Sequence, residues 1–342
     1  MFQKSKLLRV LAVALIFVTV SFCQINSTGK KSVERAQYIL QKNTHVDKSN
    51  AISKPPPPPR IKYHFMLRKF LSLSIPNMSP SEIAEKYGIP KTPRENMTCN
   101  TNGTTAIGWI PSDPSHGVTN QSSGLIPRFI FQSWITNDLV KPLCDNAISW
   151  SLMNPEYDYF LFDDSAVDRF ILLEYGRDIF EEYSCINVGA GKCDVWRLLI
   201  VYLLGGIYFD LDCRPRQRFA EWGFGNHTVV TGRPRPIFGN GAHQWGMIYS
   251  PRHPVMRASI LQVLENLWER TAAHVYDIGF NAFEEAWVNS QYNQSHMPGW
   301  GPKMGSRVVF QQVEAKEAME SNGKHWRVEK DIWRKECIVR IE

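Results

Sequence analysis

Short apolar runs alternate with longer amphipathic stretches along the chain from about Leu125. The apolar runs have the length and the aromatic and β-branched content of buried strands, and they are 126–134, 157–164 and 207–212. The helical patterns between them are 141–157, 166–176 and 191–206, with ends marked by Pro155 and by Gly205-Gly206. Strands separated by helices of this length predict an α/β domain with a mostly parallel sheet and helices on both faces.

The pattern before Leu125 is less regular. Residues 61–73 fit one amphipathic helix and residues 79–90 a second, with Ser81 as its N-cap. Residues 25–60 are polar and end in KPPPPPR, which is typical of a polyproline II spacer. We therefore expect a main domain at 125–342, preceded by a stem or linker at 25–124.

The first 24 residues have the features of a targeting segment. Lys4, Lys6 and Arg9 precede an apolar run from Val10 to Cys23. This run has the length of a cleaved signal sequence and, with Leu7 and Leu8 added, reaches the lower limit for a membrane span. In either case the basic flank stays in the cytosol and the rest of the chain faces the lumen. A buried N-terminal helix is the weaker alternative, because the run has no caps and no polar face.

Two further signals favour a lumenal environment. The first is a set of N-x-[ST] glycosylation sequons, three of them within 96–120: Asn26, Asn77, Asn96, Asn102, Asn120, Asn226 and Asn293. The second is an even number of cysteines once Cys23 is set aside: Cys99, Cys144, Cys185, Cys193, Cys213 and Cys337. These allow up to three disulfides of undetermined connectivity. No CxxC pair is present, which makes a zinc site improbable on spacing.

Charge is distributed unevenly. The net charge is +6, but residues 1–70 hold thirteen Lys or Arg against only Glu34 and Asp47, and the remainder is net acidic. A basic surface for nucleic acid would therefore lie outside the main domain, so we expect no nucleic-acid partner.

The third predicted strand ends in a candidate metal site, in the stretch GGIYFDLDC at 205–213. Residues i and i+2 of a strand share a face, so Asp210 and Asp212 would point the same way and repel each other unless a cation lies between them. Ligands gather at the carboxyl ends of parallel strands, which is where this pair falls.

The helix before that strand carries a second charged pair. Asp194 and Arg197 are three residues apart, so they share a helix face among apolar neighbours. Buried charges need partners. Two alternatives are open: a structural ion pair, or a pair that binds the hydroxyl groups of a sugar and a phosphate.

The segment KCDVWRLLIVYLLGGIYFDLDC at 192–213 resembles the signature of glycosyltransferase family 32, in which an Asp-x-x-Arg helix leads into a D-x-D strand. The segments IPRFIFQSW, NPEYDYFLFDD and HQWGMIYSPRHPVMR match other parts of the family in order, over about residues 125 to 310. Gln244-Trp245 and His253-Pro254 look most like the branch that contains the fungal Golgi initiating α-1,6-mannosyltransferase.

The resemblance implies a GT-A fold, a nucleotide-sugar donor, Mn²⁺ and retention of anomeric configuration. Ligation by oxygen atoms alone suits Mn²⁺ or Mg²⁺ better than zinc. The same resemblance implies transfer of a hexose, with GDP-mannose as the favoured donor and a glycan, glycoprotein or glycolipid as acceptor. A UDP-sugar donor for galactose or N-acetylglucosamine is the alternative. It also implies a single-pass type II Golgi membrane protein, with secretion after signal cleavage as the other possibility.

The resemblance also implies roles for individual residues. Asp212 would bind the metal, and Asp210 would bind a metal-bound water or the donor ribose. Asp194 and Arg197 would hold the donor hexose, and Tyr208 would help to enclose the nucleotide. The first strand supplies three further candidates for contact with the base, with a place in the core as the alternative reading for each aromatic residue: Phe131, Gln132 and Trp134.

Two parts of the family pattern have only weak counterparts. A C-terminal histidine often completes the metal site, and the candidates are His243, His296 and His325. The acceptor loop is matched only loosely at 298–302. Spacing does not choose a catalytic nucleophile among Asp277, Glu284 and Glu285.

Two other classes of protein are compatible with parts of the pattern. A metal-dependent phosphodiesterase also uses clustered aspartates, but it needs a second metal site. The sequence contains one His-x-Asp motif that could contribute to such a site, His45-Val46-Asp47, and it lies within the predicted stem. A lumenal binding protein without turnover is the other alternative, and the intact set of Asp194, Arg197, Asp210 and Asp212 argues against it.

Overall fold

The computed structural model describes residues 60–116, 125–222, 229–232, 243–270, 272–290, 308–310 and 332–333. All of them belong to one compact unit, Pro55–Glu342. The predicted targeting segment, the polyproline spacer and the sequons at Asn26, Asn120, Asn226 and Asn293 lie outside the described residues. Among the helices that are described, none has the length and apolarity needed to span a bilayer.

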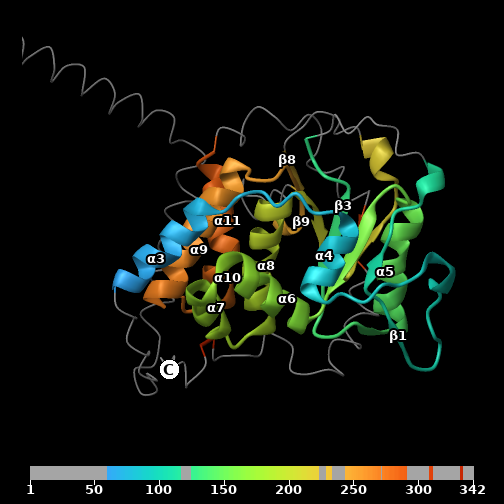
Figure 1. Cartoon of the computed structure of the whole chain (residues 1–342), viewed down its shortest axis with the longest axis horizontal. Coiled ribbons are helices and arrows are strands. Elements are labelled where there is room, and N and C mark those ends of the chain that lie inside the picture. The colour runs from blue at the N-terminus through green and yellow to red at the C-terminus, as the bar shows by residue number, and fades with distance from the viewer. Residues whose placement is uncertain are drawn as a thin grey trace, which may run out of the picture. The chain divides into compact units, whose positions relative to one another are not determined.

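The centre of the unit is a six-stranded sheet in the order β2-β5-β3-β6-β9-β8 (Figure 1). Its strands are β2 (Trp109–Ile110), β3 (Phe129–Ser133), β5 (Asp158–Phe162), β6 (Gly206–Phe209), β8 (Val229–Gly232) and β9 (His243–Tyr249). Only β5, β3 and β6 run parallel; β2, β9 and β8 pair antiparallel with their neighbours.

The expectation of a mostly parallel sheet is therefore wrong, and the sheet is mixed. Helical patterns separate the strands only as far as β6. Between β6 and β9 the described residues contain no α-helix that could carry a parallel crossover, so the chain returns in the antiparallel direction. Two small two-stranded sheets flank the main one: β1 (Thr104–Ala106) with β4 (Asp138–Val140), and β7 (Cys213–Pro215) with β10 (Val308–Phe310).

Helices cover both faces of the sheet, as the sequence predicts. The described helices are α3 (Arg60–Ser72), α4 (Pro80–Tyr87), α5 (Lys141–Met153), α6 (Asp164–Phe170), α7 (Arg177–Ser184), α8 (Gly189–Leu204), α9 (Pro254–Glu269), α10 (Val275–Ile278) and α11 (Phe280–Val288). A π-helical turn, η4 (Ile171–Tyr175), follows α6, and the described 3₁₀ turns are η2 (Arg94–Asn96), η3 (Pro114–His116) and η5 (Phe219–Trp222). Alternate strand residues enter different cores: Phe131 and Tyr208 pack with α8 and α9, and Ile130 and Phe209 pack with α5.

Residues 60–116, expected to form part of a stem or linker, pack into this unit. Met66 and Phe70 of α3 and Tyr87 of α4 are buried in the same core as α8. Strand β2 pairs with β5 at the edge of the main sheet. A strand of two residues is too short to produce a readable alternation, which explains why the pattern before Leu125 gave no sheet strand.

The N-cap of α4 is Ser79, not the predicted Ser81. The Ser79 hydroxyl accepts a hydrogen bond from the main-chain N–H of Glu82, and the Glu82 carboxylate accepts one from the main-chain N–H of Ser79. This reciprocal capping box needs Glu at the third helical position, and Pro80 suits the first.

A sharp turn links α8 to β6. Gly205 has φ +67° and Gly206 φ +102°, in the left-handed region that only glycine adopts easily. A Cβ on Gly206 would lie 2.9 Å from the main-chain oxygen of Phe129, in the neighbouring strand β3. The two glycines therefore let the chain reverse against the sheet and set where β6 begins, and hence where it ends.

Candidate active site

The two aspartates lie in a tight turn after β6. The strand ends at Phe209, and residues 210–212 form the turn that leads into β7, closed by a hydrogen bond of 2.9 Å from the main-chain N–H of Cys213 to the carbonyl oxygen of Asp210. The prediction that both carboxylates continue one strand face is therefore wrong, because the strand stops before them.

Three buried side chains hold the main chain of this turn. The Gln132 amide donates a hydrogen bond of 3.0 Å to the carbonyl oxygen of Asp210. The Asn146 amide donates one of 3.1 Å to Leu211, and the Trp150 indole N–H donates one of 2.9 Å to Cys213. The turn is thus fixed from β3 and from α5 and is not a free loop.

Asn146 and Trp150 are site residues that the sequence pattern did not indicate. Both are buried polar or amphipathic residues in α5, four residues apart, so they lie on one face of the helix. A buried asparagine in an otherwise apolar helix face was the available signal, since a buried amide needs hydrogen-bond partners. The partners are more than sixty residues away along the chain, so sequence alone could not identify them.

Arg197 joins the two charged pairs that the sequence singles out. Its guanidinium lies 3.0 Å from a carboxylate oxygen of Asp194 and 3.0 Å from one of Asp210. It also donates hydrogen bonds to the main-chain oxygens of Cys193 and Gln244, and its plane lies over the Tyr208 ring at 4.8 Å. The Tyr208 hydroxyl donates a hydrogen bond of 2.6 Å to Asp210. Asp194, Arg197, Tyr208 and Asp210 therefore form one connected cluster.

Burial and charge shift the pKa values of this cluster. Burial raises the pKa of Asp194 to about 6, against the opposing effect of Arg197. Burial and the Asp210 charge raise the pKa of Asp212 to about 6. Burial lowers the pKa of Arg197, but Asp210 and its other neighbours outweigh this, so the net shift is upward and the guanidinium stays charged.

The turn has the donors that a divalent cation prefers. Carboxylate oxygens suit Mn²⁺ and Mg²⁺, and the partly exposed Asp210 and Asp212 supply them, with Asp210 already held by Arg197 and Tyr208. The high pKa of Asp212 has the repulsion of Asp210 as one of its causes, which a bound cation would relieve. No group of three possible metal ligands occurs among the described residues. Of the histidine candidates, His296, His325 and the side chain of His243 lie outside the described part.

The first-strand candidates occupy three different environments. Phe131 is buried in the core, stacked on Phe160. Gln132 is fully buried; its amide nitrogen is bonded to the turn and its oxygen accepts from the Tyr159 hydroxyl at 2.9 Å, so it supports the site from behind. Trp134 is only partly buried, beyond the end of β3. Of the three, Trp134 retains surface that a base could contact.

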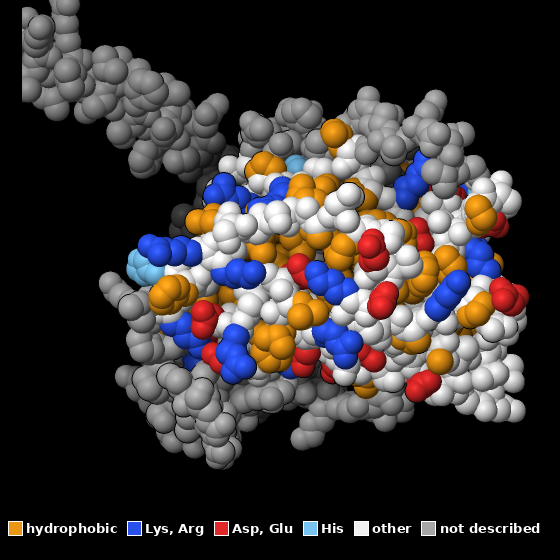
Figure 2. Space-filling model, in the orientation of Figure 1, with side chains coloured by type: hydrophobic (Ala, Val, Ile, Leu, Met, Phe, Trp, Pro, Cys, Tyr) orange, Lys and Arg blue, Asp and Glu red, His pale blue; other side chains and the backbone are white. Residues whose placement is uncertain are grey.

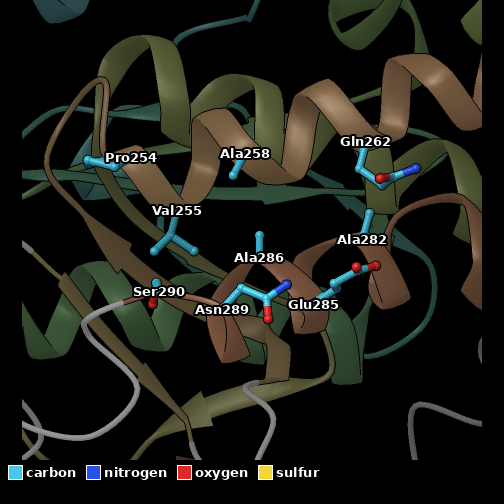
Figure 3. Close-up of a pocket in the computed structure, with 9 residues that line it drawn as sticks. All are labelled: Pro254, Val255, Ala258, Gln262, Ala282, Glu285, Ala286, Asn289 and Ser290. Carbon is cyan, nitrogen blue, oxygen red and sulfur yellow. The ribbon is translucent and has the colours of Figure 1, made fainter. Parts of the chain in front are cut away.

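The carboxylates considered as nucleophiles lie on other elements. Asp277 caps α10: one of its oxygens accepts from the main-chain N–H groups of Ala273 and His274, and the other accepts from the Asn281 amide. Glu285 is exposed on α11 and lines a groove against α9, whose residues do not include the aspartates of the turn (Figure 3). Glu284 is partly exposed on the same helix. The spacing left the choice among these three carboxylates open, and we assign none of them as a nucleophile.

Fewer cysteines form disulfides than the even cysteine count allows. Cys99 and Cys144 form a disulfide that ties the segment before β1 to α5. Cys185 is also disulfide-bonded. Cys193 and Cys213 are free thiols, so the three disulfides that the count allowed are not all formed. Cys193 lies within the charged cluster, 3.2 Å from Arg197 and 3.3 Å from the Tyr208 hydroxyl.

Comparisons with known proteins agree with the resemblance seen in the sequence. Residues 144–229 match the family described as "Glycosyltransferase sugar-binding region containing DXD motif". That segment contains α8, β6 and the aspartate turn, together with Asn146 and Trp150 of α5. The matches support a transferase.

Similar curated proteins are fungal mannosyltransferases. The chain is 32% identical over 98 residues to inositol phosphoceramide mannosyltransferase 3 of Schizosaccharomyces pombe, covering 29% of this chain and 27% of that protein. It is 30% identical over 149 residues to mannosyl phosphorylinositol ceramide synthase CSH1 of Saccharomyces cerevisiae, covering 42% and 35%. It is 22% identical over 163 residues to the initiation-specific alpha-1,6-mannosyltransferase of S. pombe, covering 42% and 41%. In each case the matched region is less than half of the relative's length.

Proposed function

We propose that this chain, which carries the sugar-binding region of the DXD-containing glycosyltransferases at residues 144–229, transfers mannose from GDP-mannose to a glycan or glycolipid acceptor in the secretory pathway. The observation that carries the proposal is the position of Arg197, which contacts both Asp194 and Asp210 at 3.0 Å. It couples a buried carboxylate suited to sugar hydroxyls with the carboxylate of the metal turn. The fold we propose is of the GT-A class, with retention of anomeric configuration.

Each residue of the cluster has a specific part in the proposed reaction. Asp210 and Asp212 would hold Mn²⁺ or Mg²⁺, which as a Lewis acid neutralises charge on the leaving nucleoside diphosphate. Arg197 keeps Asp210 in place and presents a positive charge beside the turn. Asp194, with its pKa raised to about 6 by burial, is ionised at neutral pH and can accept hydrogen bonds from donor hydroxyls. Trp134 offers a partly exposed ring to the base.

The relatives suggest a class of acceptor. One protein reported above is named an inositol phosphoceramide mannosyltransferase and another a mannosyl phosphorylinositol ceramide synthase, and both share higher identity with this chain than the initiation-specific enzyme does. We therefore favour a lipid acceptor that carries a sugar or cyclitol headgroup over a glycoprotein acceptor.

The test is a donor panel with the purified full chain. GDP-mannose, UDP-galactose, UDP-N-acetylglucosamine and UDP-glucose are each incubated with Mn²⁺, and hydrolysis of the donor is measured. We expect GDP-mannose to turn over fastest, and the Asp210→Asn/Asp212→Asn variant to be inactive. Faster hydrolysis of a UDP-sugar would contradict GDP-mannose as the donor. If none of the four nucleotide sugars is hydrolysed, a binding protein without catalysis is favoured.

A second arm tests the acceptor. Inositol phosphoceramide in detergent micelles and a soluble mannose oligosaccharide are offered together with the preferred donor, and the mannosylated product is identified by mass spectrometry. Transfer to the oligosaccharide alone would contradict the lipid acceptor while leaving the donor assignment intact.

A further inference from the structure

The outer face of α3 combines exposed apolar and basic side chains. Phe65 and Leu71 have exposed fractions of 54% and 50%, and Arg68 and Lys69 lie exposed between them. Met66 and Phe70 on the opposite side are fully buried, and Phe70 packs on Tyr202 of α8 with ring centroids 5.1 Å apart. The helix is thus fixed to the core, and its apolar outer residues are not left exposed by loose packing. We call Phe65, Arg68, Lys69 and Leu71 the outer face of α3.

The basic groups of this face form no ion pair with an acid of the described residues. No Asp or Glu occurs between Lys48 and Ser81, a stretch that includes all of α3. Lys62, on the inner side, is paired with Glu181 at 2.6 Å. Within the described part of the chain, neither Arg68 nor Lys69 forms an ion pair. Figure 2 shows blue basic and orange hydrophobic side chains side by side over this part of the molecule.

The surface continues onto the turn between α6 and α7. The aliphatic part of Lys69 lies beside Gly176, where a Cβ would be 3.6 Å from the lysine Cε. Just before that glycine, Leu172 and Leu173 are exposed to 41% and 51%, and Arg177 follows it on the exposed side of α7. This second segment therefore adds two exposed leucines and an arginine to the neighbourhood of α3, together with the partly exposed acids Glu174 and Asp178.

On α3 itself, exposed apolar side chains are flanked by Arg and Lys, a combination that fits the interface of a bilayer containing anionic lipids. The acid within the neighbouring turn, Glu174, is paired with Lys86. We propose that the outer face of α3, extended by Leu172, Leu173 and Arg177, docks on an anionic phospholipid surface. Phe65 and Leu71 would enter the headgroup region, while Arg68 and Lys69 contact lipid phosphates.

The length of the chain before α3 is consistent with this partner. The expected membrane segment ends at about Gln24 and α3 begins at Arg60. Thirty-five residues separate the two in the sequence, and α3 is the first helix that the structure describes after them. Docking would keep the domain at the membrane surface from which a lipid acceptor is taken. The docking itself does not depend on the proposed function, but this consequence rests on it.

The test uses the full chain reconstituted into vesicles of phosphatidylcholine alone or of phosphatidylcholine with phosphatidylserine. Hydrogen–deuterium exchange of the peptide that covers residues 60–73 is followed by mass spectrometry. We expect slower exchange in the anionic vesicles, with the difference reduced by high salt. Phe65→Ser with Arg68→Gln should remove most of it, since one basic group near such a surface changes the docked-to-free ratio by about fivefold.

A matched control removes the same kinds of side chain elsewhere. Leu152→Ser with Arg257→Gln replaces an exposed leucine of α5 and an exposed arginine of α9, and it should exchange like the parent. Equal exchange of the parent in the two kinds of vesicle would overturn the proposal, as would equal loss of protection in both variants. Protection that depends on protein concentration would instead indicate a second copy of the chain. None of these readouts requires enzymatic turnover, so their failure is separate from failure of the proposed function.

Discussion

The side-chain amide of Asn146 donates a hydrogen bond of 3.1 Å to the carbonyl oxygen of Leu211, the residue between the two aspartates. This contact joins a helix on one face of the sheet to the turn that would hold the metal. It restrains the middle of the turn, while Gln132 and Trp150 restrain its two ends.

Asn146→Leu should therefore lower activity beyond its effect on stability. The variant leaves the Leu211 carbonyl without its donor, at a cost of about 1–3 kcal/mol in unfolding free energy. Displacement of the turn by a fraction of an ångström should lower kcat/KM by at least about tenfold. Donor hydrolysis and urea unfolding measure the two effects. Ser149→Ala is the control, because that hydroxyl bonds only within α5, to the Asn146 carbonyl; a similar loss of activity there would contradict the role of Asn146.

Asp212 should be required for activity but should lower the stability of the metal-free protein. Burial and the Asp210 charge raise its pKa to about 6, so the carboxylate is unfavourable at neutral pH when no metal is bound. Asp212→Asn should therefore lower donor turnover by about 100-fold or more. The same variant should raise the melting temperature of the metal-free protein. The corresponding free energy is on the order of 1–3 kcal/mol.

Metal removal gives the companion measurement for Asp212. Excess EDTA should stop turnover by the parent, and Mn²⁺ should restore it while raising the parent's melting temperature more than that of Asp212→Asn. Full turnover in EDTA, or an equal rise in both proteins, would exclude metal binding by this turn.

The elements of the site were predictable to the extent that their signals are local. The helical pattern at 191–206 and the strand after it correspond to α8 and β6, and the three-residue spacing of Asp194 and Arg197 places them in contact. The contacts to Asn146 and Trp150 depend on how α5 packs against the turn, which no local spacing encodes. The same holds for β2, whose two residues are recognisable as a strand only from their pairing with β5.

The free thiols offer a probe of the site that does not depend on turnover. Cys193 is partly exposed within the charged cluster and Cys213 is buried, whereas Cys99, Cys144 and Cys185 are in disulfides. Under native, non-reducing conditions, alkylation should modify Cys193 among these five, and Cys213 only after unfolding. Because Cys193 lies 3.2 Å from Arg197, donor with Mn²⁺ should slow its modification. Mass spectrometry of the peptides checks both points; rapid labelling of Cys144 in the folded protein would contradict the disulfide.

His253 should make the domain less stable as the pH falls. Burial lowers its pKa from 6.5 to about 4. The unfolded chain therefore binds a proton at a higher pH than the folded one, so the contribution of His253 is fully present above pH 6.5 and is lost between pH 6.5 and 4. The maximum loss is about 3 kcal/mol.

The variant His253→Asn isolates this contribution. The His253 side chain accepts a hydrogen bond from the main-chain N–H of Val255 at the start of α9, and asparagine can replace it as an N-cap. Urea unfolding at pH 7 and pH 5 should show a smaller decrease for the variant than for the parent. The comparison cancels Asp194 and Asp212, whose raised pKa values act in the opposite direction. An identical decrease in both proteins would mean that His253 does not titrate as its burial implies.

Asp194 can be tested as a sugar-binding carboxylate against its alternative role as a structural partner of Arg197. Removing one member of a buried ion pair lowers the free energy of unfolding by roughly 3–5 kcal/mol, because the other charge is left without a partner. Arg197 would not be left so, since it also contacts Asp210 at 3.0 Å and two main-chain oxygens. Asp194→Asn keeps the shape, so we expect only a modest change in melting temperature and a decrease in kcat/KM of about 100-fold, or ~3 kcal/mol.

The control is Glu182→Gln. Glu182 lies on α7, is fully buried, and faces two cations: Arg270 at the end of α9, at 3.2 Å, and Lys62 of α3, at 3.3 Å. That variant should show the opposite pattern: a large loss of stability, of about 3–5 kcal/mol, and near-parent donor hydrolysis per folded molecule. Thermal unfolding and donor hydrolysis of the two variants, measured side by side, give the comparison. If Asp194→Asn instead unfolds as readily as Glu182→Gln, or folds and turns over donor at the parent rate, the carboxylate is a structural partner of Arg197 and the hexose is held by other groups.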